Sequence, residues 1–127
     1  MRIRALKHIF KFHGCRESLS FALKGLIYLF LYHRNMRIIF LMGILAIFAA
    51  FYFELRGIEI VALSITVTLV FIAEIFNTAI EMMMNMLTTK YHTRIKLIKD
   101  IAAAVVLLTC INAFVVGLIL FLRKLLR

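Results

Sequence analysis

The sequence predicts an all-α membrane protein, in which an N-terminal interfacial amphipathic helix precedes three transmembrane helices within one membrane domain, residues 1–127. Three observations predict this class. The chain is 65% hydrophobic, whereas about half is normal for a soluble domain. Proline is absent, and the mean hydropathy is +1.02. The chain contains several apolar stretches of about 20 residues or more, and about 20 residues is the length that crosses a bilayer as a helix.

Residues 1–33 form the predicted surface segment. The apolar stretch 18–32 contains Lys24 and is too short to cross a bilayer comfortably, so we expect an interfacial helix that leads into the first span. Basic residues that alternate with Ile, Leu and Phe suit anionic lipid headgroups, at about 1 kcal/mol for each nearby cation. The same charges also fit a purely topogenic role. They are Arg2, Arg4, Lys7, Lys11 and Arg16.

Three spans are predicted at about residues 36–53, 58–87 and 98–122, and the short link Glu54–Gly57 requires the first two to be antiparallel. Lys and Arg number eight in residues 1–37, one in this link, four in residues 90–99 and three after residue 122. The positive-inside rule therefore predicts a multi-pass membrane protein with the N-terminus and the second link, residues 88–99, in the cytoplasm. We expect the inner (plasma) membrane as its location. Three spans then leave the basic C-terminal tail on the far side, against that rule.

Glu74 and Glu81 are the ionisable residues of the apolar stretch 60–89. An ionised carboxylate at the bilayer centre costs roughly 2.5–3.5 kcal/mol. Glu74, Asn77, Thr78 and Glu81 follow the spacing i, i+3, i+4, i+7, so they share one helical face. This polar stripe, as we call these four residues, can avoid lipid and is the candidate functional site.

Lys99 and Asp100 begin the third predicted span, one link after Glu81. Because antiparallel neighbours meet at this link, both residues are expected near the same membrane boundary as Glu81. Carboxylate and amide oxygens suit Mg²⁺, which also binds substrate phosphates, and a lysine suits phosphate. A carboxylate in an apolar setting can serve as general base on an alcohol. These residues predict phosphoryl transfer, although a proton pathway or a structural pair also fits the stripe.

Other functional classes are disfavoured by what the sequence lacks. It contains no G-x-x-x-x-G-K-[ST] phosphate loop. Cys15 and Cys110 have no paired spacing for zinc or a disulfide framework. The net charge of +10 is distributed along the flanks of the spans rather than gathered on one soluble face, so nucleic acid is not an expected partner.

Two motifs resemble those of a known family. The segment EIFNTAIE at 74–81 resembles the E-x-x-N-[ST]-A-I-E signature of the small prokaryotic diacylglycerol kinase and undecaprenol kinase family. KDIAAAV at 99–105 resembles that family's K-D-x-A-A-x-A-V stretch. SFALKG at 20–25 and RNMR at 34–37 resemble its amphipathic segment and the start of its first span. The resemblance covers nearly the whole chain.

The resemblance implies an integral-membrane homotrimer with active sites at the cytoplasmic interface. Such an enzyme transfers the γ-phosphate of MgATP to the hydroxyl of a lipid, either diacylglycerol or undecaprenol. Glu74 matches the position of the general base, and Glu81 matches a metal-binding carboxylate. Asn77, Lys99 and Asp100 match residues of the nucleotide site. Magnesium is the implied cofactor, and ATP the implied co-substrate.

Two positions depart from the family pattern. His33 stands where the family has a glutamate that helps to hold the metal, and Asn85 stands where an aspartate usually follows Glu81 by four residues. A neutral imidazole or amide can still ligate a metal. The expected metal ligands are therefore Glu81, His33 and Asn85.

His92 and Arg16 complete the expected nucleotide site. Tyr91 and His92 resemble a Tyr-His pair that lies near the nucleotide in some members of the family, and Arg16 could reach a phosphate from the surface segment. Two alternatives to a lipid kinase stay open at this point. One is a catalytically altered or inactive relative that serves as a membrane scaffold or regulator, and the other is a small ion or proton pathway.

Overall fold

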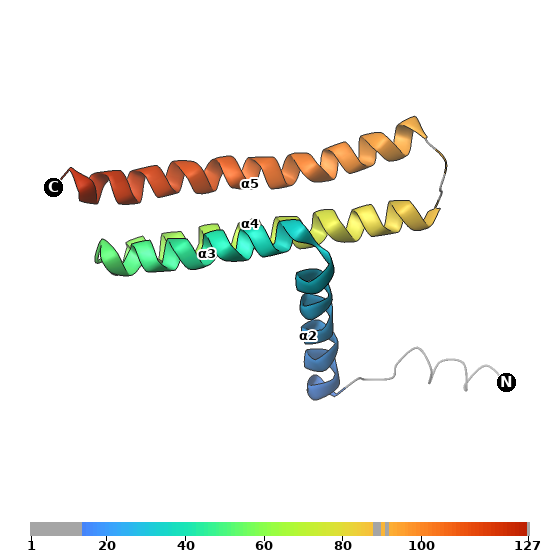
Figure 1. Ribbon diagram of the computed structural model, residues 1–127, viewed down its shortest axis with the longest axis horizontal. Helices are drawn as coiled ribbons and strands as arrows, with labels where there is room; N and C mark the ends of the chain where they lie inside the picture. The colour runs from blue at the N-terminus through green and yellow to red at the C-terminus, as the bar shows by residue number, and fades with distance from the viewer. Residues whose placement is uncertain (1–13, 88–89, 91, 127) are drawn as a thin grey trace. The chain divides into compact units, whose positions relative to one another are not determined.

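The computed structural model describes residues 14–87, 90 and 92–126, and all regular secondary structure in this part of the chain is helical (Figure 1). The helices are α2 (Cys15–Tyr32), α3 (Arg34–Tyr52), α4 (Ile58–Leu87) and α5 (Thr93–Leu125). Of these, α3, α4 and α5 are long and apolar enough to cross a membrane. The predicted all-α class with three candidate spans is thus confirmed. The predictions for Arg2, Arg4, Lys7, Lys11 and Tyr91 concern residues outside the described ones.

Helix α2 and His33 belong to one compact unit, and helices α3, α4 and α5 form a second unit. Apolar side chains are exposed along most of α2. The helix ends at His33, which adopts an extended backbone (φ −112°, ψ 113°) while its N–H still donates to the Leu29 carbonyl at 2.9 Å. The interfacial location of α2 stays a prediction.

The link between α3 and α4 is closed by a Schellman motif. The Leu55 N–H donates to the Ala50 carbonyl at 2.9 Å, and the Glu54 N–H donates to the Phe51 carbonyl at 3.2 Å. Glu54 has φ 50° and Gly57 has φ 56°, so both lie in the left-handed region. Leu55 is only 4% exposed. The tight turn makes α3 and α4 antiparallel, as the short link predicted.

Helices α3 and α4 approach each other closely at Gly43, which is buried. A Cβ atom at this position would lie 3.5 Å from Phe71 Cε2 and 3.5 Å from Val67 Cγ1. These are ordinary van der Waals distances, so the site has room for a methyl group and little more. Small residues let membrane helices pack closely, and such packing drives their association.

Helix α4 is the central element of the second unit and packs against both α3 and α5. In α5, Ala102 is buried, whereas Ala103 and Ala104 are exposed. The buried face of α4 carries polar as well as apolar side chains: Leu63, Thr66, Val70, Ala73, Glu74 and Thr78. The polar stripe therefore contributes to the core of the three-helix unit.

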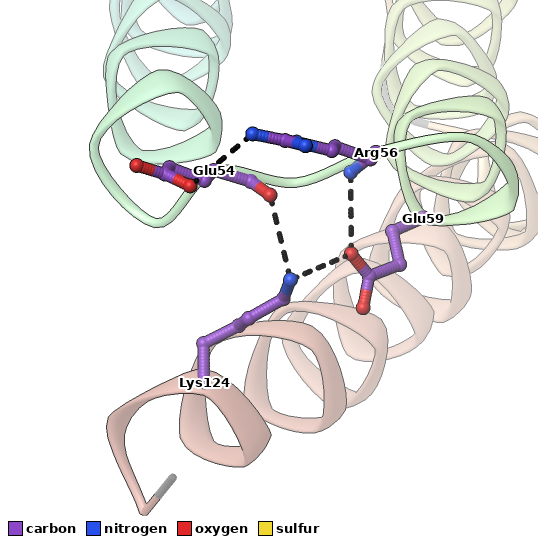
Figure 2. Close-up of polar contacts among 4 residues, drawn as sticks. All are labelled: Glu54, Arg56, Glu59 and Lys124. Carbon is purple, nitrogen blue, oxygen red and sulfur yellow. Dashed lines mark hydrogen bonds and ion pairs between the residues drawn. The ribbon is translucent and has the colours of Figure 1, made fainter.

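The end of α5 is tied to the α3–α4 link by a polar cluster of Glu54, Arg56, Glu59 and Lys124, the loop–tail cluster (Figure 2). Lys124 Nζ lies 3.1 Å from Glu59 Oε2 and 3.4 Å from the Glu54 carbonyl oxygen. The Arg56 N–H donates to Glu59 Oε2 at 3.2 Å, and its guanidinium lies 3.4 Å from Glu54 Oε2. Lys124, part of the basic tail, thus has a structural role beside the first link.

An apolar groove of about 670 Å³ is lined by residues of α3, α4 and α5. It extends to Phe53 and Leu125, near the loop–tail cluster, and includes Met42, Val67 and Phe114. No residue of the polar stripe lines it. The groove and the polar stripe are therefore distinct features of this unit.

We expect Gly43→Leu to separate α3 from α4, because the larger side chain needs the space that Phe71 and Val67 occupy. Overpacking of this kind costs about 1–3 kcal/mol. Thermal unfolding in mild detergent, followed by circular dichroism, should show a lower transition temperature. Gly43→Ala is the control and should unfold close to the wild type. An unchanged transition in Gly43→Leu would show that the helices do not meet at this residue.

We also expect Glu59→Gln and Lys124→Met each to lower the unfolding temperature, since each breaks the ion pair between α4 and α5. In the double variant the loss should be smaller than the sum of the single losses, because the second substitution has no ion pair left to remove. High salt should reduce the difference in unfolding temperature between each variant and the wild type, because it screens the ion pair. Strictly additive losses would mean that the two residues do not interact.

Candidate active site

The polar stripe runs from the interior of α4 to its exposed end. Glu74 is 3% exposed and Thr78 is 2% exposed. Asn77 is half-buried and Glu81 is exposed. This increase in exposure along the polar stripe follows from the different lengths of α3 and α4. Helices α3 and α4 leave the same tight link, but α3 has 19 residues and α4 has 30, so α4 extends past the start of α3 (Figure 1).

Glu74 is a buried carboxylate with no partner in the described part of the chain. No ion pair or hydrogen bond there involves its side chain. In the described residues, however, every fully buried side-chain oxygen or nitrogen atom has a hydrogen-bond partner. The small exposed fraction of Glu74 therefore includes its carboxylate oxygens.

Lys99 is brought to the end of α4 across the α4–α5 link. Its ammonium donates a hydrogen bond to Asn85 Oδ1 at 2.5 Å. Asn85 is one helical turn beyond Glu81, so this contact places Lys99 near the exposed end of the polar stripe. The expected proximity of Lys99 to this end of the second span is thereby confirmed. Lys99 is half-buried, and its neighbour Asp100 is exposed.

The remaining site predictions are distributed over both units. His92 is the N-cap of α5 and is exposed, and its carbonyl accepts a hydrogen bond from the Lys96 N–H at 3.0 Å. In the first unit, Arg16 is exposed, and the half-buried ring of His33 lies 6.0 Å from the Tyr28 ring. Nucleotide contacts of Arg16 and His92 and a metal contact of His33 stay predictions.

The described residues contain no cluster of three or more His, Cys, Asp or Glu that could enclose a metal. In the second unit, Glu81 offers one exposed carboxylate near Lys99. Asn85, also expected as a metal ligand, has its amide oxygen on the Lys99 ammonium. Neither this hydrogen bond nor the ion pair between Glu59 and Lys124 was predicted from the sequence. Both depend on the register of α4 against α5, which no motif encodes.

These observations define a small integral-membrane protein with a polar site near one end of its spans. It has three apolar helices of spanning length, a buried carboxylate in α4, and a lysine that contacts the exposed end of α4. Residues 20–121 match the family model for prokaryotic diacylglycerol kinase. The chain belongs to this family. The matched region includes the whole polar stripe, Asn85 and Lys99, whereas Arg16 precedes it.

Two relatives illustrate the similarity. A diacylglycerol kinase of Synechocystis sp. is 39% identical over 110 residues, which make up 86% of this chain and 63% of that protein. An undecaprenol kinase of Bacillus subtilis is 36% identical over 75 residues, 59% of this chain and 61% of that protein. The match thus spans a little over three-fifths of the length of each relative.

Proposed function

We propose that this protein is a lipid kinase, which transfers the γ-phosphate of ATP to the hydroxyl group of a membrane lipid alcohol. The observation that carries the proposal is the arrangement along α4. Glu74 is buried among the apolar helices, Glu81 is exposed two turns later, and Lys99 reaches Asn85 one turn beyond. The names of the two relatives support a lipid alcohol as the acceptor.

In the proposed reaction Glu74 is the general base. The lipid hydroxyl oxygen attacks the γ-phosphorus, the bond from that phosphorus to the bridging oxygen breaks, and ADP leaves. The hydroxyl proton passes to the Glu74 carboxylate. The burial of Glu74 within an apolar helix supports this role, because the headgroup of a lipid can approach such a position without leaving the membrane. The half-buried amide of Asn77, on the same face, is proposed to orient the reacting groups.

The two glutamates have separate roles in this proposal. Seven residues at 1.5 Å each separate them by about 10 Å along the helix axis, so they do not act on the same atom. Lys99 is proposed to bind the phosphates of ATP as a point charge, with Asp100, His92 and Arg16 as further nucleotide contacts. Phosphoryl transfer relies mainly on positioning and charge neutralisation, which such residues provide.

Magnesium fits the residues that are present. Mg²⁺ usually binds through one or two carboxylates, substrate phosphates and waters rather than in a complete protein cage. The exposed Glu81 carboxylate, together with the phosphates of ATP, meets this requirement, and His33 remains a candidate second ligand. When bound, the ion would neutralise charge on the transferred phosphate.

We further propose a homotrimer in the inner membrane with the α4–α5 link in the cytoplasm. The exposed apolar side chains of α3, α4 and α5 leave large surfaces for lipid or for other subunits, and one exposed carboxylate makes a sparse metal site within a single chain. Lys90, Arg94, Lys96 and Lys99 support a cytoplasmic link by the positive-inside rule. α2 is proposed to lie at the membrane interface.

Glu74→Gln should abolish phosphorylation while the fold is retained. Removing a general base typically costs 10²–10⁴-fold in rate, so we expect a loss of at least about 100-fold. Protein in lipid vesicles would be incubated with Mg²⁺ and radiolabelled ATP, with diacylglycerol or undecaprenol as the acceptor. Circular dichroism would verify the helical content.

Glu54→Gln is the matched control, because it removes an exposed carboxylate from the loop–tail cluster, and it should leave the rate unchanged. A wild-type rate in Glu74→Gln would show that another group accepts the proton. If the wild-type chain phosphorylates neither alcohol, the inactive-relative alternative is favoured.

A further inference from the structure

Two lysines link α4 and α5, and they do so in different ways. At one end Lys124 pairs with the Glu59 carboxylate at 3.1 Å (Figure 2). At the other end Lys99 donates to the Asn85 amide oxygen at 2.5 Å. The first contact cancels the charge of the lysine. The second fixes the position of the ammonium and leaves its charge intact, because an amide is neutral.

Lys99 forms no ion pair in the described part of the chain, although Asp100 is its neighbour in sequence. Lys99 is half-buried and Asn85 is exposed, so the hydrogen-bonded ammonium lies at the edge of the helix pair. A nucleotide phosphate that approaches this edge encounters an ammonium that is hydrogen-bonded to a neutral amide and forms no ion pair.

We propose that Asn85 is a positioning residue for Lys99, which holds the ammonium at the exposed end of the polar stripe with its full charge available to the phosphates of ATP. The proposal rests on the lipid kinase function proposed above. It gives Asn85 a specific role: a carboxylate at this position would form an ion pair with Lys99 and compete with the phosphates for it.

This role conflicts with direct metal binding by Asn85. Magnesium binds oxygen at about 2.1 Å. An ion on Asn85 Oδ1 would therefore lie close to the Lys99 ammonium, which already occupies that oxygen at 2.5 Å. Two positive charges on one neutral oxygen repel each other. In this arrangement the oxygen serves the lysine, and Glu81 is the carboxylate left for the metal.

The test measures binding of a non-hydrolysable ATP analogue to the purified full-length protein in detergent. Four proteins are compared: wild type, Asn85→Asp, Lys99→Met, and the double variant. We expect Asn85→Asp to raise the dissociation constant roughly fivefold, as expected when an exposed ion pair of about 1 kcal/mol competes with the ligand. In the Lys99→Met background the same substitution should have a much smaller effect, since the ammonium is absent.

Steady-state kinetics provide a second readout. Asn85→Asp should raise the KM for ATP and leave kcat nearly unchanged, a pattern that a loss of folding would not produce. The proposal is overturned if Asn85→Asp binds the analogue as tightly as the wild type, or if its effect is equal in both backgrounds. It is also overturned if Asn85→Asp lowers the Mg²⁺ concentration needed for half-maximal activity, because that result would identify residue 85 as a metal ligand.

The failure of the proposed function is distinguishable from these outcomes. A wild-type chain that binds the analogue but phosphorylates neither diacylglycerol nor undecaprenol would refute the lipid kinase. The dependence of analogue binding on Asn85 and Lys99 would still be measured in that case, and would decide the role of Asn85. A wild-type chain that binds no nucleotide would overturn both.

Discussion

A carboxylate within an apolar membrane helix is the constraint on which the rest of the structure depends. Glu74 is nearly fully buried in α4 and has no ion pair in the described residues. Exposure of such a group to lipid is costly, so the stripe must face other protein. Helix α4 accordingly lies between α3 and α5, and the tight turn at Glu54–Gly57 and the small Gly43 allow α3 to pack closely against it.

The unequal lengths of α3 and α4 create the candidate site. The section of α4 that runs beside α3 buries Glu74, whereas the section beyond α3 exposes Glu81 and Asn85. One helix face thus offers an apolar environment, where we propose that a lipid hydroxyl binds, and, two turns away, an exposed environment, where we propose that the nucleotide binds. A kinase that joins a membrane substrate to a water-soluble one needs both, which is why we assign the two glutamates different roles.

Much of this arrangement was predictable from the sequence, and the reasons are local. The i, i+3, i+4, i+7 spacing places Glu74 and Glu81 on one face of any helix, and a four-residue link allows only an antiparallel pair. Helix α5 begins at Thr93, before the predicted span at about residue 98, because Arg94 and Lys96 are good helix formers even where the chain is too charged for lipid.

The contacts that pair α4 with α5 could not be predicted, because they depend on how the two helices are aligned. Glu59 meets Lys124 at one end, and Asn85 meets Lys99 at the other. Asn85 was expected to bind metal, since the family has an acid there. Its observed partner is a lysine fourteen residues away.

We propose that Glu74 serves the chemistry of this protein and not its stability. The most direct test is the unfolding of Glu74→Leu in mild detergent, compared with the wild type. Replacing a buried charged group by an apolar one of similar volume is often neutral or stabilising. We therefore expect Glu74→Leu to be at least as stable as the wild type and to have no phosphotransfer activity. A marked loss of stability would contradict this proposal, because the carboxylate would then be part of what holds the helices together.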